Sequence, residues 1–447
     1  MEPSEVLRCK NKLIEQISKS FDKEKIEQIA FDTKFVQRES KFTGVDFFFL
    51  CVFAHQIDST MSLEGLCAEL LKEEGKYLCK QSLQDRYNDE GVSFMKQMVH
   101  EALKDKIDLP PIVPHPDFGR IILGDSTVFE LPEKFSDKYA GSGGGASKAA
   151  VKIQYNYDLL RQDIQSITLQ KGTCSDVKQE LGIVQKNDLR IEDMGYFKLQ
   201  RFEDIVKAEA YFLSRLKFGT LVYEHNELGY QEIDLLKIQK KMKAGERKIM
   251  KVYLGKKEKL PVRLILEKVP VKVADEKRRK LKTDKQNKRK NLSKRRLEFC
   301  NLNVYITNTT EEQLPSEQVR NYYSLRWQIE LVFKAWKSVY NIDKIKPMKI
   351  QRFECNLYGT LLLIILTTNL LAFYKRNLYQ STKKELSEIK MFKTLKHLLP
   401  TLKKAVTKSK KSIIKFMNLL EDIVLKTCIK QQKRNALNPF NIISIAP

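Results

Sequence analysis

The stretch YSLRWQIELVFKAWK, residues 323–337, decides how this chain is interpreted. It places Tyr323, Arg326, Glu330 and Lys337 at successive offsets of three, four and seven residues. On a continuous helix, which turns by about 100° per residue, these four side chains fall within an arc of roughly 60°. We therefore expect one helix whose border carries a carboxylate between two cations and a phenol. The apolar residues form an adjoining stripe that would pack on a core: Leu325, Ile329, Val332, Phe333, Trp336 and Val339.

The border of this helix has the side chains for metal-assisted chemistry on a phosphate backbone. A carboxylate binds metal ions, and Arg and Lys bind phosphate oxygens. By itself, the stretch fits equally well an ordinary amphipathic surface helix with an Arg326–Glu330 ion pair. The rest of the chain decides between these two interpretations.

An excess of basic residues indicates a polyanionic partner. The chain has 447 residues, of which 42% are hydrophobic, so we expect a folded protein with a sizeable core. Lys and Arg outnumber Asp and Glu by 81 to 56, which gives a formal net charge of +25. A charge of this size favours DNA, RNA or an acidic membrane surface as the partner.

The cysteines and the N-terminus indicate a reducing compartment. The eight cysteines have neither zinc-ligand spacing nor the spacing of a disulfide framework, and the first residues lack the features of a signal peptide. We expect a cytoplasmic protein. The segment LYGTLLLIILTTNLLAFY, residues 357–374, is about long enough to cross a bilayer. Its polar Thr and Asn residues favour a buried core helix instead, so no membrane partner is expected.

The first 115 residues have a helical pattern. Residues 62–74 begin with the good capping residue Ser62, and residues 80–88 follow after a short turn at Gly75. This pair fits a helix-turn-helix DNA reader and a plain helical bundle equally well. We predict that residues 1–115 form a helical N-terminal region, which is DNA-binding if this pair is a helix-turn-helix.

Beyond a proline-rich boundary at residues 110–114, strands and helices are mixed. We predict an α/β catalytic core from residues 116–216 and 302–380, with a helix at 175–185. Between its two parts, residues 217–301 form a β-rich insertion that ends in a basic arm, because 277–296 holds twelve Lys or Arg against one acid. Residues 381–447 are predicted to form a helical C-terminal region.

Two aspartates follow predicted core strands. Asp125 comes after the apolar run 120–124, and Asp193 comes after residues 189–192. Ligands of open α/β sheets gather at the carboxyl ends of strands, and Glu330 would come from a helix beside the sheet. Three converging carboxylates can hold two divalent ions about 3.5–4 Å apart, and oxygen ligands suit Mg²⁺ or Mn²⁺. A lone Asp after a strand is more often a turn or helix cap, so the prediction depends on the whole set.

These motifs resemble those of the DDE transposases of bacterial insertion sequences, in the subgroup named for a Tyr-Arg-Glu-Lys signature. The resemblance covers nearly the whole chain. It depends on residues 124–127 (GDST), residues 193–197 (DMGYF) and the signature Tyr323, Arg326, Glu330 and Lys337. The family implies an RNase H-like catalytic core with a β-rich insertion domain, flanked by helical N-terminal and C-terminal regions.

The resemblance also implies roles for residues. Those matching Asp125, Asp193 and Glu330 bind two Mg²⁺ or Mn²⁺ ions per active site. Those matching Tyr323, Arg326 and Lys337 hold DNA phosphates at the transposon end. The implied reaction is cut-and-paste transposition by nicking, hairpin formation, hairpin opening and strand transfer. The implied partners are double-stranded DNA, both element ends and target, and a second subunit in a synaptic homodimer.

One feature departs from the family. Some relatives stack a flipped base on a Trp of the insertion domain, whereas Trp327 and Trp336 of this chain both lie in the signature stretch. Tyr223, Tyr230 and Tyr253 of the insertion could supply a stacking face. Two other classes remain open: a DNA-binding protein that has lost mobility, and a different RNase H-like nuclease or resolvase.

Overall fold

The computed structural model describes residues 3–58, 61–105, 109–287, 291–431 and 438–444. The chain forms two compact units, which are described separately. The sheet unit consists of Val113–Asp125, Cys174–Trp327 and Leu437–Pro447. The helical unit consists of Met1–Ile112, Ser126–Thr173 and Gln328–Ala436.

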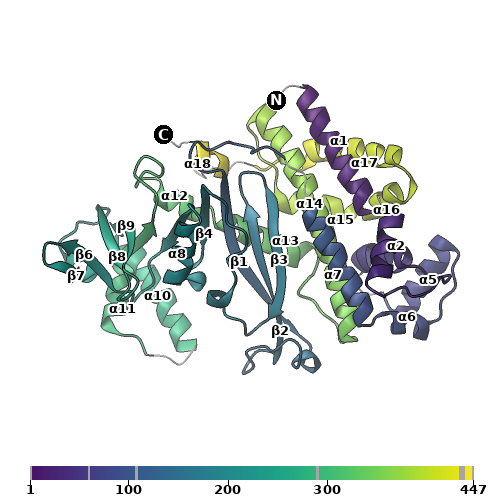
Figure 1. The fold of residues 1–447 in the computed structure, drawn as a ribbon, viewed down its shortest axis with the longest axis horizontal. Coiled ribbons are helices and arrows are strands. Elements are labelled where there is room, and N and C mark those ends of the chain that lie inside the picture. Colours follow the sequence, from purple (N-terminus) through teal and green to yellow (C-terminus); the bar gives the residue numbers. More distant parts are fainter. Residues whose placement is uncertain (1–2, 59–60, 106–108, 288–290, 432–437, 445–447) are drawn as a thin grey trace. The chain divides into compact units, whose positions relative to one another are not determined.

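The sheet unit is built on strands in the order β1-β4-β5-β10-β9-β8-β6-β7. The pairs β1·β4 and β4·β5 are parallel, and the remaining pairs are antiparallel. The short hairpin β6–β7 lies at one end of this order (Figure 1). The strands are β1 (Arg120–Leu131), β4 (Asp188–Glu192), β5 (Tyr211–Arg215), β6 (Val222–Asn226), β7 (Gly229–Glu232), β8 (Arg247–Leu254), β9 (Leu260–Lys268) and β10 (Leu302–Thr307).

The two faces of this sheet differ in polarity. Side chains alternate between the faces along a strand, so Val304 and Ile306 of β10 lie on one face and Asn303 and Tyr305 on the other. Val304 and Ile306 belong to a buried apolar cluster that also contains Phe202 of helix α8 (Leu199–Lys207). The opposite face carries polar side chains. The other helices of the sheet unit are α9 (Leu235–Lys240), α10 (Val271–Asn287), α11 (Lys294–Glu298), α12 (Val319–Ser324) and α18 (Pro439–Ser444).

The helical unit surrounds the long helix α14 (Ile350–Thr382). An apolar window of this helix is 89% buried, as the sequence predicts for a core helix. Helix α7 packs along α14 (Figure 1). The unit also contains the antiparallel pair β2 (Ala149–Asp158) and β3 (Asp163–Lys171). Its other helices are α1 (Pro3–Ser20), α2 (Lys23–Asp32), α3 (Gly44–Phe49), α4 (His55–Ile57), α5 (Leu63–Glu74), α6 (Lys80–Arg86), α7 (Asp89–Lys104), α13 (Trp327–Val339), α15 (Glu388–His397), α16 (Leu399–Lys408) and α17 (Lys410–Thr427).

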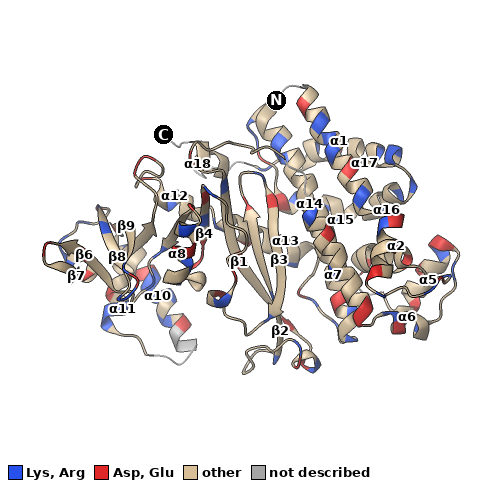
Figure 2. Ribbon diagram, in the orientation of Figure 1, with Lys and Arg blue, Asp and Glu red and all other residues tan. Residues whose placement is uncertain are grey.

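The predicted fold class is confirmed: the chain is α/β, with helical regions toward both ends. Strands β2 and β3 follow β1 on one side, and strands β4 and β5 follow it on the other. The resulting order, β3-β2-β1-β4-β5, is that of an RNase H-like core. Among the described residues of 217–301 the structure has four strands, β6, β7, β8 and β9. The basic arm contains the helices α10 and α11, and it is rich in Lys and Arg (Figure 2).

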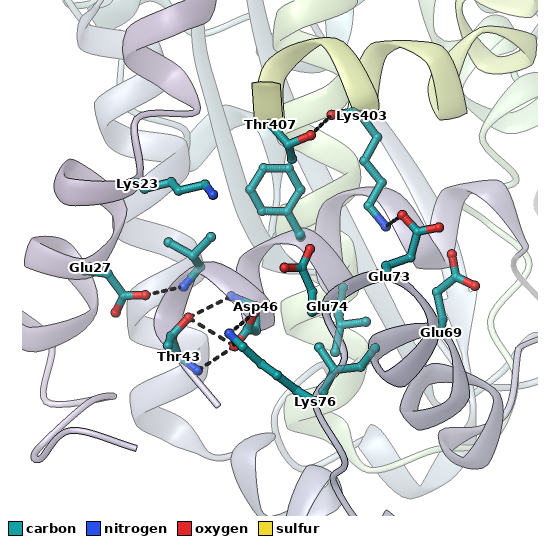
Figure 3. Close-up of a pocket in the computed structure, with 14 residues that line it drawn as sticks. Lys23, Glu27, Thr43, Asp46, Glu69, Glu73, Glu74, Lys76, Lys403 and Thr407 are labelled. Atoms are coloured by element: carbon teal, nitrogen blue, oxygen red, sulfur yellow. Dashed lines mark hydrogen bonds and ion pairs between the residues drawn. The ribbon is translucent and has the colours of Figure 1, made fainter. Parts of the chain in front are cut away.

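Helix α5 begins where the sequence places it, because the Ser62 side chain accepts a hydrogen bond from the Gly65 N–H. A cavity of about 270 Å³ lies among α2, α3, α5 and α16 (Figure 3). Its charged groups are partly neutralised by one another: Lys76 Nζ lies 2.7 Å from Asp46, and Lys403 Nζ lies 3.5 Å from Glu73. Helices α5 and α6 are in contact, and the helix-turn-helix interpretation stays a prediction.

Three local predictions are wrong. The signature stretch is not one helix, because a turn at residues 325–326 separates α12 from α13. The N–H groups of Leu325 and Arg326 bond to carbonyls three residues back, which tightens the end of α12 and breaks the continuous arc of side chains. Residues 175–185 hold only a 3₁₀ turn, Asp176–Lys178, and β1 continues through Asp125 instead of ending there.

Candidate active site

Asp125 and Asp193 lie at the same edge of the parallel part of the sheet. In the register of β1 and β4, Gly124 faces Glu192, so the residue that follows each of them is an aspartate. The Asp125 side chain is 17% exposed and that of Asp193 is 44% exposed. Parallel strands therefore bring together two carboxylates that are distant in the sequence, with one of them open to solvent.

A buried ion-pair network holds the strand that leads to Asp193. Arg201 of α8 donates two hydrogen bonds to the Glu192 carboxylate, at 2.6 and 2.7 Å, and Arg190 donates a third at 3.2 Å. Although burial opposes ionisation, the two guanidinium groups lower the pKa of Glu192. Glu192, the last residue of β4, is thus held in place, and Asp193 is the next residue in the sequence.

Arg326 provides positive charge at this pair of aspartates. Its Nη1 donates to Asp125 Oδ2 at 2.9 Å, and its Nε lies 3.9 Å from Asp193 Oδ1. The next residue, Trp327, is 59% exposed, and the Arg326 guanidinium lies 5.9 Å from its ring centroid. Arg326 therefore bridges the two carboxylates, and its predicted role as a DNA phosphate ligand stays a prediction.

Tyr323 lies beside the same group of charges. Burial, and then the negative charge of Asp193, raise the pKa of its phenol to about 12. Its ring contacts Tyr305 of β10 in an edge-to-face arrangement with centroids 5.6 Å apart. The phenol, which like an ordinary tyrosine is protonated at neutral pH, consequently keeps its proton further into the alkaline range and can donate a hydrogen bond.

Glu330 and Lys337 belong to the helical unit, on α13, where Ile329, Val332, Phe333 and Trp336 are buried. The apolar stripe of the signature thus packs as predicted. Within the described ranges no group of three or more His, Cys, Asp or Glu residues has the geometry of a metal site. The convergence of Glu330 with Asp125 and Asp193 therefore stays a prediction.

The two aspartates fit a hard divalent cation in their donor chemistry. Both supply carboxylate oxygens, and the pair already attracts the Arg326 cation. Oxygen-only donors favour Mg²⁺ or Mn²⁺ over Zn²⁺. Asp125 and Asp193 would be the ligands that the sheet unit supplies to such an ion.

The three insertion tyrosines lie together near the β6–β7 hairpin. Tyr223 faces Tyr253 across β6 and β8, and the rings of Tyr230 and Tyr253 have centroids 5.0 Å apart. Lys259 Nζ covers the Tyr223 ring at 2.9 Å and lies 4.9 Å from the Tyr230 centroid. Tyr230 is 43% exposed, whereas Tyr223 is 9% exposed, so Tyr230 offers the more open ring.

Sequence reasoning missed several residues of these sites. Arg201 and Arg190 could be suspected only as charged residues in apolar surroundings. His225 joins the tyrosines through strand register, and Lys259 joins them from the connection between β8 and β9. His225 faces Tyr230 on the neighbouring strand, with ring centroids 4.7 Å apart. Cross-strand partners of this kind cannot be located until the register is known.

Comparisons with known proteins agree with the geometry. Residues 116–366 match the family model described as "Transposase DDE domain". The chain is 32% identical to the transposase for insertion sequence element IS1151 of Clostridium perfringens, over 97% of this chain and 96% of that protein. It is 31% identical to the transposase for IS231E of Bacillus thuringiensis subsp. finitimus, over 94% and 92%.

Among solved structures, the chain is similar to the piggyBac transposase in its synaptic complex with hairpin DNA, with a TM-score of 0.46 and 11% identity, over 90% of this chain and 84% of that one. The domain match covers more than half of this chain, and the sequence match to the insertion-sequence transposases covers nearly all of it. A DDE domain implies the use of divalent metal ions, and transposition requires DNA binding. This chain belongs to the DDE transposases of insertion sequences.

Proposed function

We propose that this transposase moves its element by cut and paste, through strand cleavage, hairpin formation and strand transfer. The observation that best supports the chemistry is the adjacent placement of Asp125 and Asp193 on parallel strands, with Arg326 at 2.9 Å from Asp125. The hairpin step and the assignment to the Tyr-Arg-Glu-Lys subgroup are supported by the signature residues alone.

In this proposal Asp125, Asp193 and Glu330 hold two Mg²⁺ or Mn²⁺ ions. Bound ions would supply an activated oxygen nucleophile and stabilise the leaving oxygen of the DNA strand. Arg326 exchanges its carboxylate partner for a phosphate oxygen, and Lys337 holds a second phosphate. The protonated Tyr323 hydroxyl donates a hydrogen bond to the same strand.

The proposed partners are the inverted-repeat ends of the element, the target DNA and a second copy of the chain. The +25 charge and the basic helices α10 and α11 support a DNA partner (Figure 2). Helices α5 and α6 are the candidates for sequence reading in the helical unit, and synapsis of two ends requires at least a dimer. We place the protein at the bacterial nucleoid in the cytoplasm.

The direct test is cleavage of DNA that carries the element ends. Wild-type protein with Mg²⁺ should cut this DNA, and Glu330→Ala should bind it normally but cut it at least about 1,000-fold more slowly, equivalent to about 4 kcal/mol in the barrier. Lys334→Ala, an exposed position on the same helix, is the matched control and should cut normally. Normal cutting by Glu330→Ala would show that this carboxylate is not catalytic.

We also propose that the insertion tyrosines stack an unpaired base. Replacing Tyr230 or Tyr253 by Ala should weaken binding of an end with one unpaired base by about tenfold, since base–aromatic stacking is worth about 1–3 kcal/mol. Binding of a fully paired end should change little, and Tyr→Phe variants should bind like wild type because they keep the ring. Fluorescence anisotropy with the two DNAs measures the difference. Equal losses on both DNAs would contradict a stacking role.

A further inference from the structure

A second group of cations lies on the polar face of the sheet unit. Arg215 on β5 faces Tyr305 on β10 in the strand register, and Asn303 on β10 faces Glu267 on β9. Because Asn303 and Tyr305 are two residues apart, all four side chains point to the same face, opposite the apolar cluster. Helices α10 and α12 add Lys277 and Arg320 to this face.

The group holds more positive charge than its carboxylates balance. Lys277 Nζ donates to Asn303 Oδ1 at 2.6 Å and to the Leu302 carbonyl at 3.0 Å, and Arg215 donates to the same Asn303 oxygen at 3.3 Å. Glu267 is engaged by the Asn303 amide at 3.0 Å and by Arg320 at 3.6 Å. Among the described residues, neither Arg215 nor Lys277 has a carboxylate in ion-pair contact.

Three cations therefore lie near Glu267, which among the described residues is in ion-pair contact with Arg320 but not with Arg215 or Lys277. The Lys277 ammonium is half-buried, and neutral oxygens accept its hydrogen bonds. Burial, and then the nearby Arg215 charge, lower its pKa to about 8. A bound anion would relieve this excess of charge.

The group connects to the active site through two tyrosines. Tyr305 lies beside Arg215 in the register, and its ring contacts Tyr323 at a centroid distance of 5.6 Å. The charges that act on the Tyr323 phenol are those of Asp193, Arg326 and Arg215. The pKa of the Tyr323 phenol therefore responds both to Asp193 and to Arg215 of the second group of cations.

We propose that Arg215, Lys277 and Arg320 form a phosphate-binding subsite for the DNA backbone next to the cleaved position. The subsite rests on the proposed function and adds three residues outside the signature. Guanidinium groups match phosphate geometry, and Lys adds a point charge. A phosphodiester is the occupant we favour, since DNA is the polyanion that has to pass the neighbouring aspartates.

The test measures binding of an element-end duplex by the full-length protein. Arg215→Gln and Lys277→Gln should each weaken binding by about tenfold at moderate salt and reduce the slope of log K against log salt by about one. Lys277→Gln keeps a hydrogen-bond donor toward Asn303 while it removes the charge. Lys280→Gln, an exposed position on α10, is the matched control and should have a smaller effect.

Neutral methylphosphonate linkages identify the occupant. Neutral linkages are placed one at a time along each strand. The linkage at the subsite should weaken wild-type binding more than it weakens Lys277→Gln binding, because the variant has already lost one of the three charges that hold this phosphate. If each linkage that weakens wild-type binding weakens the variant equally, the subsite is overturned.

The pH dependence separates charge from structure. As Lys277 loses its proton between pH 7 and pH 9, wild-type affinity should fall by about tenfold, and Lys277→Gln should lose this dependence. The other groups whose charges act on this ammonium are Arg215, Cys300, Glu267 and Arg320. Because a thiol can also lose a proton in alkaline solution, the same affinity measurements across pH are repeated with the Cys300→Ser variant. An unchanged pH profile in Lys277→Gln would overturn the assignment.

Cleavage distinguishes failure of the subsite from failure of the proposed function. If the wild-type protein cuts element ends and both Gln variants bind like wild type, only the subsite is overturned. If the wild-type protein neither binds nor cuts those ends, the proposed function fails and the subsite with it.

Discussion

Replacing Asp193 by Cys is expected to reduce Mg²⁺-dependent cleavage of element ends by at least about 1,000-fold, with partial recovery in Mn²⁺. Asp193 directly follows β4, its side chain is 44% exposed, and the residue before it, Glu192, faces Gly124, the residue before Asp125. A thiolate is a poor ligand for Mg²⁺, whereas Mn²⁺ accepts sulfur more readily. Cleavage rates in the two metals, measured on the same DNA, give the ratio.

Asp193→Ala is the control for this exchange. It removes the ligand without supplying sulfur, so Mn²⁺ should not restore its activity. Full Mg²⁺ activity in Asp193→Cys would mean that this carboxylate does not bind the catalytic metal. Equal recovery of the Cys and Ala variants in Mn²⁺ would show that the metal effect is general and not a property of the introduced thiol.

Replacing Arg201 by Met should lower the free energy of unfolding by about 3–5 kcal/mol, because it leaves the Glu192 carboxylate buried without its main partner. Arg201 contacts Glu192 at 2.6 and 2.7 Å, and both side chains are 6% exposed. Urea unfolding followed by circular dichroism measures the loss. Lys207→Met, an exposed position on the same helix, is the matched control and should change stability by less than about 0.5 kcal/mol.

The same ion pair predicts how stability depends on pH. The pKa of Glu192 is lowered in the folded protein, so its contribution is fully present above the ordinary carboxyl pKa of about 4.5 and is lost as pH falls through the folded value. The wild-type protein should therefore lose stability steeply in acid, and Arg201→Met should lose less. Parallel acid profiles of the two proteins would contradict the assigned role of Arg201.

The sequence predicted those parts of the fold that depend on local patterns. The run before Asp125 is apolar enough to be a buried strand, Leu189 and Ile191 alternate with charged residues before Asp193, and Ser62 begins α5 because its side chain can cap a helix. The turn at Leu325 and Arg326 was missed, since the apolar spacing continues through it unchanged. A periodic pattern defines a face and does not reveal a local change from four-residue to three-residue hydrogen bonds.

Other features depend on contacts between distant segments. Residues 175–185 have helix-compatible composition, but the Gln179 carbonyl accepts a hydrogen bond from Arg201 at 2.8 Å, and Gly182 has a φ of 71°. Both hold the segment in an irregular path. Likewise, the pairing of Arg215 with Tyr305 depends on strand register across 89 intervening positions, and no local pattern specifies it.

The pairing of β5 with β10 also has an evolutionary consequence. The chain leaves the parallel strands after Arg215 and returns at Leu302 on the adjacent strand, with the Leu216 N–H bonded to the Val304 carbonyl at 2.9 Å. The residues at which the chain leaves and re-enters the sheet are thus neighbours in space, like the two ends of a hairpin. The intervening segment can lengthen, shorten or be exchanged between lineages without moving the strands that carry the aspartates. The strands that carry the aspartates and the inserted segment can therefore diversify at separate rates.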